Sequence, residues 1–284
     1  MPELPEVETI VRQLNQVIRG KTVAQVRVFR KKSFRGNKKL LLGKLVTKTR
    51  RKAKVILIDF ETDFPKLLIH LKMTGQLIFV DKDKQVAGGH PTLEWLAQHP
   101  VKHTRVEIKF KDGSSLFFND MRVFGWVKVI GNQKSLDQEL KEFSGIEPLA
   151  SEFTVSSLAS ALSASSRPVK LVLMDQKKVA GVGNIYANDV LWDAGIDPRR
   201  PAKTLNTQEI RKLHESLNKI IELGIKYGGT SQSSYRQLLG EEGDYQYHFL
   251  VYKKEGSACQ RCGTIIQKTK LGGRGTFYCQ YCQK

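Results

Sequence analysis

Two pairs of cysteines near the carboxyl terminus constrain the fold more than any other feature of this chain. All four cysteines lie within its last 26 residues, as two C-x2-C pairs separated by 16 residues: Cys259, Cys262, Cys279 and Cys282. Two such knuckles at the base of a hairpin present four thiolates to one tetrahedral ion. We therefore predict one structural Zn²⁺ ion, with a hairpin turn at 271–276 between strands at 265–266 and 277–278. A pair of disulfides is the alternative, which the lack of a secretory signal pattern disfavours.

The charge of the chain indicates a polyanionic partner. Its 47 lysines and arginines exceed its 28 aspartates and glutamates, which gives a net charge of +19 over 284 residues. Such a charge favours binding to nucleic acid, because phosphate contacts release condensed counterions. A membrane partner is disfavoured, since we find neither an 18-residue apolar run nor a basic amphipathic helix. We expect a cytoplasmic protein.

The first half of the chain predicts one helix followed by strands. Residues 5–19 have helical spacing of apolar side chains, with Pro5 in the first turn and Gly20 after the end. Short β-branched and aromatic runs then alternate with turns, which is typical of a sandwich or barrel. The expected strands are 23–29, 55–60, 66–70, 76–80, 105–110, 115–118 and 126–129.

The second half is expected to be helical before the cysteine hairpin. Residues 151–227 contain helices, of which 207–227 is the clearest, and the glycine-bearing turn at 179–184 joins two of them. The fold class is therefore α+β and multidomain. We predict a β-sandwich catalytic domain at 1–132, a linker at 133–150, a helical domain at 151–230 and a zinc hairpin at 245–284.

Pro2 is the first residue with usable chemistry, provided that Met1 is removed. A small second residue favours that removal, and it would expose a secondary amine with a pKa of about 8. A useful fraction of this amine is neutral near pH 7 and can form an iminium with an aldehyde-like carbon. Glu3 and Glu6 are close enough in sequence to donate a proton or orient the amine. Taken alone, these residues also fit an inert helix start.

Seven short segments together resemble the formamidopyrimidine-DNA glycosylase family, bacterial base-excision-repair enzymes that remove oxidised purines. The resemblance extends over essentially the whole chain, and the joint pattern is more specific than any single segment. The segments are residues 2–8, 51–54, 70–75, 102–103, 120–125, 175–187 and 272–276.

The resemblance implies a catalytic role for five residues. Pro2 is the nucleophile that forms a Schiff base, Glu3 is the acid at the sugar ring oxygen, and Glu6 is a supporting carboxylate. Lys54 reaches the lesion and assists β-elimination, while Arg274 binds phosphate and assists δ-elimination. By its sequence alone, the basic segment around Lys54 also fits a solvated turn before a strand.

The resemblance also implies a set of DNA contacts. Met73, Arg122 and Phe124 match a trio that fills the void left when a damaged base is extruded from the duplex. The other DNA-binding residues are expected to be His70, His103, Lys170, Asn184 and Tyr252. Taken alone, Met73 and Phe124 fit core residues, and each histidine fits a structural one. The implied partner is damaged double-stranded DNA, bound by a monomer that associates with the nucleoid.

Several positions depart from the family pattern. Lys72 and Lys253 stand where the pattern usually has glycine, and both add positive charge. Ser165 replaces a basic residue of some relatives, and 231–234 matches the lesion-capping loop poorly. Two other functions remain open: an endonuclease VIII-type glycosylase for oxidised pyrimidines, and a non-catalytic zinc-ribbon DNA-binding protein.

Overall fold

The computed structural model describes residues 1–81, 84–89, 99–230 and 243–284. It divides into two compact units, each built from two stretches of the chain. The first unit comprises Met1–Leu140 and Tyr227–Asp244, and the second comprises Lys141–Lys226 and Tyr245–Lys284. None of the described helices is both long and apolar enough to cross a membrane.

The first unit is a sandwich of two five-stranded sheets with orders β1-β8-β9-β6-β7 and β2-β10-β5-β4-β3. Neighbouring strands pair antiparallel except β2 and β10, which are parallel. The strands are β1 (Val23–Val28), β2 (Phe34–Arg35), β3 (Val46–Lys52), β4 (Val55–Phe60), β5 (Lys66–His70), β6 (Gly75–Asp81), β7 (Lys84–Gly89), β8 (Thr104–Phe110), β9 (Ser115–Asp120) and β10 (Trp126–Ile130). Two 3-10 turns, η1 (Lys31–Ser33) and η2 (Lys38–Leu41), and helix α2 (Gln133–Leu140) complete this part.

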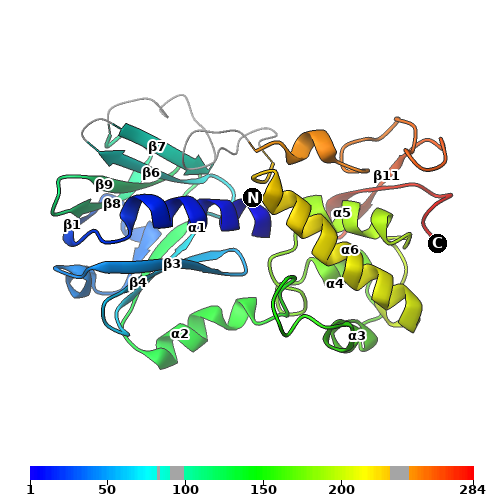
Figure 1. Cartoon of the computed structure of the whole chain (residues 1–284), viewed down its shortest axis with the longest axis horizontal. Helices are drawn as coiled ribbons and strands as arrows, with labels where there is room; N and C mark the ends of the chain where they lie inside the picture. The colour runs from blue at the N-terminus through cyan, green and yellow to red at the C-terminus, as the bar shows by residue number, and fades with distance from the viewer. Residues whose placement is uncertain (82–83, 90–98, 231–242) are drawn as a thin grey trace. The chain divides into compact units, whose positions relative to one another are not determined.

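Helix α1 (Leu4–Ile18) runs beside β3 and contributes one face to the core of the sandwich (Figure 1). Its apolar side chains recur at helical spacing, and each is at most 4 % exposed: Val7, Ile10, Val11, Leu14 and Ile18. They pack in one cluster with apolar residues from both sheets. Because this face is buried, the helix is fixed along its whole length, and so is the position of its first turn.

The second unit consists of helices followed by a two-stranded hairpin. The helices are α3 (Val155–Ser163), α4 (Val169–Leu173), α5 (Asn184–Asp193) and α6 (Thr207–Lys226). The 3-10 turns are η4 (Lys141–Phe143), η5 (Ala202–Thr204) and η6 (Tyr245–His248), and the hairpin strands are β11 (Gln267–Leu271) and β12 (Arg274–Tyr278).

The predicted fold class is confirmed, with a leading helix, a β-sandwich, a helical module and a carboxyl-terminal hairpin. All seven expected strands are present within a few residues of their predicted bounds, whereas β2, β3 and β7 were missed. The hairpin turn is tighter than predicted, because β11 and β12 leave only Gly272 and Gly273 between them, and 265–266 lies before β11. The expected linker at 133–150 contains α2 and η4. Our division into four segments stays a prediction.

Truncating the buried face of α1 should destabilise the first unit. Leu14→Ala removes a fully buried side chain from the core, so we expect the free energy of unfolding to fall by about 2–5 kcal/mol. Urea unfolding followed by circular dichroism measures the loss. Arg12→Ala, on the exposed face of the same helix, is the matched control and should change it by no more than about 0.5 kcal/mol. Equal losses for the two variants would contradict the packing of α1 described above.

Candidate functional site

The first turn of α1 places two buried carboxylates beside Pro2. Glu3 is 3 % exposed and Glu6 2 % exposed, whereas Pro2 is half-buried. The Glu6 carboxylate accepts the backbone N–H of Glu3 at 2.8 Å through one oxygen and the backbone N–H of Thr230 at 2.9 Å through the other. One side chain therefore joins the start of the helix to a segment more than 200 residues later in the chain.

Gly229 is required for this approach. Its φ of +79° is in the left-handed region, and a Cβ atom added there would lie 2.7 Å from Cγ of Glu6. Any other residue would push the Glu6 side chain or the Thr230 backbone away. The segment 231–234, which the sequence analysis compared with a lesion-capping loop, lies outside the described residues.

Lys54 and His70 are brought together in the same unit. Lys54 lies in the two-residue turn between β3 and β4 and is only 2 % exposed, so the alternative of a solvated basic turn is wrong for its side chain. Its positive charge is one of three that lower the pKa of His70. Burial is the largest cause, followed by the charges of Lys72, Lys54 and Lys128, and the pKa lies well below its usual value.

The geometry of His70 agrees with a neutral ring. Its Nδ1 accepts the backbone N–H of Lys72 at 2.9 Å, which requires that nitrogen to carry no proton. The His70 ring also packs against Trp126, with 5.6 Å between the two ring centroids. A neutral imidazole with Nδ1 occupied has its proton on Nε2, and it can use that proton as a hydrogen-bond donor.

Met73, Arg122 and Phe124 lie on two connected loops. Met73 is 39 % exposed and Phe124 51 % exposed. The alternative that these two side chains belong to the hydrophobic core is therefore wrong. The Arg122 guanidinium lies 4.7 Å from the centroid of the Phe124 ring. The exposed apolar tips and the cation thus form one projecting surface.

Asp120, which begins the matching segment 120–125 but was assigned no role from sequence, holds these loops. Its buried carboxylate accepts the Thr74 hydroxyl, the Arg122 N–H at 3.2 Å and the Gly125 N–H at 2.6 Å. The Arg122 N–H also donates to the Thr74 hydroxyl at 3.1 Å. Because Thr74 follows Met73 directly, one carboxylate fixes the position of all three members of the trio.

His103 belongs to the neighbouring backbone. Its carbonyl accepts the Asp120 N–H at 3.0 Å, and its ring Nδ1 lies 3.4 Å from the Arg105 guanidinium. Arg105 in turn donates to the Asp120 carbonyl at 2.7 Å. His103 is therefore adjacent to the loop base, which is consistent with its predicted place at the interface.

Backbone strain coincides with the candidate residues. Among the described residues, five that are not glycine have a positive φ, a conformation that L-residues rarely adopt: Ala53, Lys72, Val123, Leu149 and Lys253. All except Leu149 directly adjoin a predicted site residue. Such strain persists only where the surrounding structure enforces it, and it concentrates at functional sites. This agreement is independent of sequence motifs.

In the second unit, Lys170 is bonded to the hairpin, and Asn184 begins helix α5. Lys170 is fully buried, and its ammonium donates to the Gly275 carbonyl and the Thr276 hydroxyl, each at 2.8 Å. These partners support a role in positioning the hairpin that carries Arg274, whereas we had expected a DNA contact. The buried side-chain oxygen of Asn184 has no hydrogen-bond partner among the described residues.

The four cysteines form one cluster at the base of the hairpin. Their sulfur atoms all lie within 4.8 Å of one another, with Cys262 and Cys279 at 3.5 Å and Cys259 and Cys282 at 3.9 Å. Tetrahedral Zn–S bonds of about 2.3 Å require sulfur separations of about 3.8 Å. The cluster therefore fits one structural zinc ion, and the Trp192 indole N–H donates to the Cys259 sulfur at 3.4 Å.

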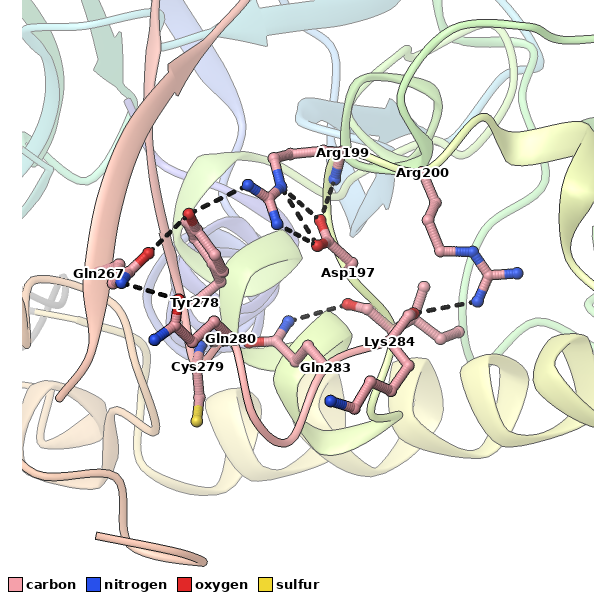
Figure 2. A network of polar contacts seen from close by, with 10 residues as sticks. Asp197, Arg199, Arg200, Gln267, Tyr278, Cys279, Gln280, Gln283 and Lys284 are labelled. Carbon is pink, nitrogen blue, oxygen red and sulfur yellow. Dashed lines mark hydrogen bonds and ion pairs between the residues drawn. The ribbon is translucent and has the colours of Figure 1, made fainter. Parts of the chain in front are cut away.

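A polar network fixes the cysteine hairpin to the loop after α5 (Figure 2). The Lys284 carbonyl accepts the Asp197 N–H at 2.9 Å and the Arg200 guanidinium at 3.0 Å, and Gln283 donates to the Ile196 carbonyl at 2.8 Å. On the strand side, Arg199 donates to the Tyr278 hydroxyl at 3.2 Å. The exposed side chain of Arg274 is thus presented at the start of a rigid strand.

Tyr252 is positioned by a second aspartate that the sequence did not reveal. The Asp189 carboxylate is fully buried and accepts the N–H groups of Val251 at 2.9 Å and Tyr252 at 3.0 Å and the Tyr245 hydroxyl at 3.1 Å. Burial raises the pKa of Asp189 to about 6, against the effect of these hydrogen bonds. In the sequence, Asp189 stands out only because it lies on the apolar side of α5. Nothing in the sequence shows which groups its carboxylate would bind.

Three family descriptions match consecutive parts of the chain. The formamidopyrimidine-DNA glycosylase N-terminal domain matches residues 1–127, the formamidopyrimidine-DNA glycosylase H2TH domain matches 144–236, and the zinc finger found in FPG and IleRS matches 256–284. The formamidopyrimidine-DNA glycosylases of Carboxydothermus hydrogenoformans and Lactobacillus delbrueckii subsp. bulgaricus are 38% and 36% identical in sequence to this chain. Each alignment covers 100% of both chains.

Solved structures of similar fold include complexes of Lactococcus lactis FPG. A mutant bound to Fapy-dG containing DNA has a TM-score of 0.87 and 33% identity, with 100% of both chains covered. The wild-type protein bound to an oxidised pyrimidine containing DNA has a TM-score of 0.85 and 34% identity, again over 100% of each chain.

We expect protonation of His70 to destabilise the first unit in mild acid. A base whose pKa is lowered on folding contributes stability that is complete above its unfolded pKa of about 6.5 and is lost as pH falls towards the folded pKa. Urea unfolding at a series of pH values should show the wild type losing stability relative to His70→Gln below about pH 6.5. A constant difference between the two proteins would contradict a neutral, buried His70, as would a ring pKa above 6.5 by NMR.

Loss of one cysteine should remove the zinc without unfolding the sandwich. Cys262→Ser leaves three thiolates, so we expect the metal content measured on the purified protein to fall well below one zinc ion per chain. The matched control is Gln280→Ser, at an exposed neighbouring position, which should keep one zinc ion. Retention of a full zinc equivalent by Cys262→Ser would contradict the four-cysteine site.

Proposed function

Since the chain belongs to the formamidopyrimidine-DNA glycosylase family, we propose that it uses Pro2 as the nucleophile of a base-excision-repair DNA glycosylase and abasic-site lyase. Its substrate is duplex DNA with an oxidised purine such as 8-oxoguanine or a formamidopyrimidine. The observation that carries this proposal is the double hydrogen bond of Glu6, which fixes the first turn of α1 and its buried carboxylates beside Pro2. The bond between Glu6 and the Glu3 N–H is one half of a capping box, which a structural helix start also has, whereas the bond to the distant Thr230 N–H is a contact that capping alone does not require.

The glycosylase step begins once Met1 has been removed and the damaged nucleotide has been flipped out of the duplex. The neutral Pro2 nitrogen attacks C1′ of the sugar, and the bond from C1′ to the base breaks with its electron pair leaving on the base. The attacking nitrogen gives up its proton, which the departing base anion takes up, so the base leaves in neutral form. Glu3 donates a proton to the sugar ring oxygen as the bond from that oxygen to C1′ breaks, and the lone pair of the Pro2 nitrogen forms the iminium double bond to C1′. Because Pro2 is a secondary amine, this iminium keeps its positive charge.

The lyase step uses that charge as an electron sink. Loss of a proton from C2′ expels the 3′ phosphate by β-elimination, and loss of a proton from C4′ then expels the 5′ phosphate by δ-elimination, with each proton taken up by solvent. Lys54 binds the phosphate beside the lesion and assists the first elimination, and Arg274 does so for the second. The burial of Lys54 next to a neutral His70 supports this role, because a desolvated cation binds phosphate more strongly than a solvated one.

The connected loops of the first unit fill the void in the DNA. Unstacking one step costs a few kcal/mol, and inserted side chains offset part of that cost. Met73 and Phe124 provide apolar surface, while Arg122 hydrogen-bonds the base left without a partner. His70, His103, Asn184 and Tyr252 bind the DNA backbone, with Lys170 positioning the hairpin beneath Arg274.

The alternative of oxidised pyrimidine substrates has one specific observation in its favour. A similar Lactococcus lactis protein has been solved with an oxidised pyrimidine containing DNA. Relative excision rates of 8-oxoguanine and oxidised pyrimidines test this alternative, and we expect the purine to be excised faster. We further propose that the protein acts as a monomer in the cytoplasm and associates with the nucleoid through DNA.

Borohydride trapping tests the nucleophile. Reduction during turnover of a duplex containing 8-oxoguanine should yield a covalent complex, and peptide mapping should place the adduct on Pro2. Pro2→Gly replaces the secondary amine by a primary one and should lower 8-oxoguanine excision. An adduct on Lys54, or full excision by Pro2→Gly, would overturn the proposed mechanism.

Glu3→Gln separates base release from the lyase step. The amide cannot donate the proton at the sugar ring, so we expect excision of 8-oxoguanine to slow by roughly 10²–10⁴-fold. Trapping on a preformed abasic site should be affected much less, because that sugar opens without an enzyme. Equal slowing of the two reactions in single-turnover assays would assign Glu3 a structural role instead.

A further inference from the structure

We propose that Lys72 and Lys253 are additional phosphate-binding residues, at backbone positions that favour glycine. Both lysines have a left-handed backbone, with φ of +49° and +56°. Each directly adjoins a residue proposed above to contact DNA, Met73 in one case and Tyr252 in the other. The proposal rests on the proposed function, because it takes the DNA backbone as the ligand.

Lys72 lies in one of two connected loops that carry exposed apolar side chains. Met73, Met121 and Phe124 are 39 %, 44 % and 51 % exposed, on loops that Asp120 connects. The charge of Lys72 is close enough to His70 to lower the pKa of that ring. Apolar side chains bordered by cations suit insertion into a duplex, where the phosphates lie on either side of the unstacked bases.

The backbone at Lys72 is fixed from both sides. Its N–H donates to Nδ1 of His70 at 2.9 Å, and the Gly75 N–H closes the turn on the Leu71 carbonyl at 2.9 Å. A Cβ atom at Gly75 would lie 2.4 Å from that carbonyl, so the turn has no room to relax. The positive φ of Lys72 is therefore imposed by the turn, which a glycine would adopt without strain.

Lys253 is the third residue of a β-turn. The Lys254 N–H donates to the Val251 carbonyl at 3.0 Å, and a positive φ at the third position is the feature that selects glycine in such turns. Asp189 holds Val251 and Tyr252 by their N–H groups, which fixes the turn. The Lys253 side chain is exposed, and no ion pair of it is found within residues 243–284 or the rest of the described chain.

A change from lysine to glycine should raise stability, because it relieves backbone strain, and should weaken DNA binding, because it removes a positive charge. Replacing either lysine by glycine relieves the backbone and also removes a cation. Each lost phosphate contact should lower the slope of log K against log salt by about 0.9. A lysine that was merely tolerated at these positions would affect stability alone.

The experiment compares three substitutions at each position: Lys72→Gly, Lys72→Gln and Lys72→Arg, with the same set at Lys253. Binding is measured from 50 to 200 mM salt on a duplex containing a tetrahydrofuran abasic analogue, which is not cleaved. The glycine and glutamine variants should bind more weakly, and their deficit should shrink about 3.5-fold over that range of salt. The arginine variants should bind as the wild type does.

Thermal unfolding of the same proteins isolates the strain. We expect the glycine variants to unfold roughly 1–3 °C higher than the wild type, whereas glutamine and arginine retain the strain and leave the unfolding temperature near that of the wild type. Lys111→Gln is the matched charge control. Its turn bonds to Thr22 beyond the carboxyl-terminal end of α1, about 22 Å of helix away from Pro2, so we expect the salt slope to stay unchanged.

Two outcomes would overturn the proposal. One is an unchanged salt slope in both glutamine variants, and the other is an equal loss of binding for Lys111→Gln. In either case, a wild-type protein that still forms the borohydride adduct leaves the proposed function standing. A wild-type protein that forms no adduct and does not prefer the abasic duplex contradicts the proposed function itself.

Discussion

The Glu6 carboxylate is the contact on which the rest of the candidate site depends. It binds the N–H of Glu3 and the N–H of Thr230 with separate oxygens, which joins the start of α1 to the segment that follows α6 in sequence. Burial of the apolar face of α1 fixes the helix along its length, and this double contact adds a polar link at its first turn. Because each of its oxygens accepts an N–H group, the Glu6 side chain is held in one orientation and suits an orienting role, and proton donation is the role that we propose for Glu3.

Strained backbone coincides with the candidate site residues of this chain. The left-handed residues Ala53 and Val123 adjoin Lys54 and Phe124, just as Lys72 adjoins Met73. In each case a short turn aims one side chain, and buried polar groups such as Asp120 hold that turn. A β-branched residue such as Val123 is particularly unfavourable at positive φ, which makes chance an implausible reason for its place.

Much of this organisation was predictable from the sequence, for physical reasons that differ between elements. Helical spacing revealed α1, and cysteine spacing revealed the metal cluster. Strand β3 was missed because three of its seven residues are consecutive arginines and lysines, whose polar heads conceal the strand pattern. The roles of Asp120 and Asp189 were missed because each binds a partner from a distant part of the chain, Thr74 and Val251 respectively, and hydrogen bonds of that kind leave no periodic signal. Lys170 was expected at DNA, because sequence shows the charge of a lysine but not its burial.

Separating the chains that retain Met1 from those that begin at Pro2 tests the central claim most directly. Intact-mass analysis defines the two fractions, and single-turnover excision of 8-oxoguanine is measured on each. The account predicts that only chains beginning at Pro2 excise the base and form a Schiff base, because an amide nitrogen cannot attack C1′. Equal activity in the fraction that retains Met1 would contradict it.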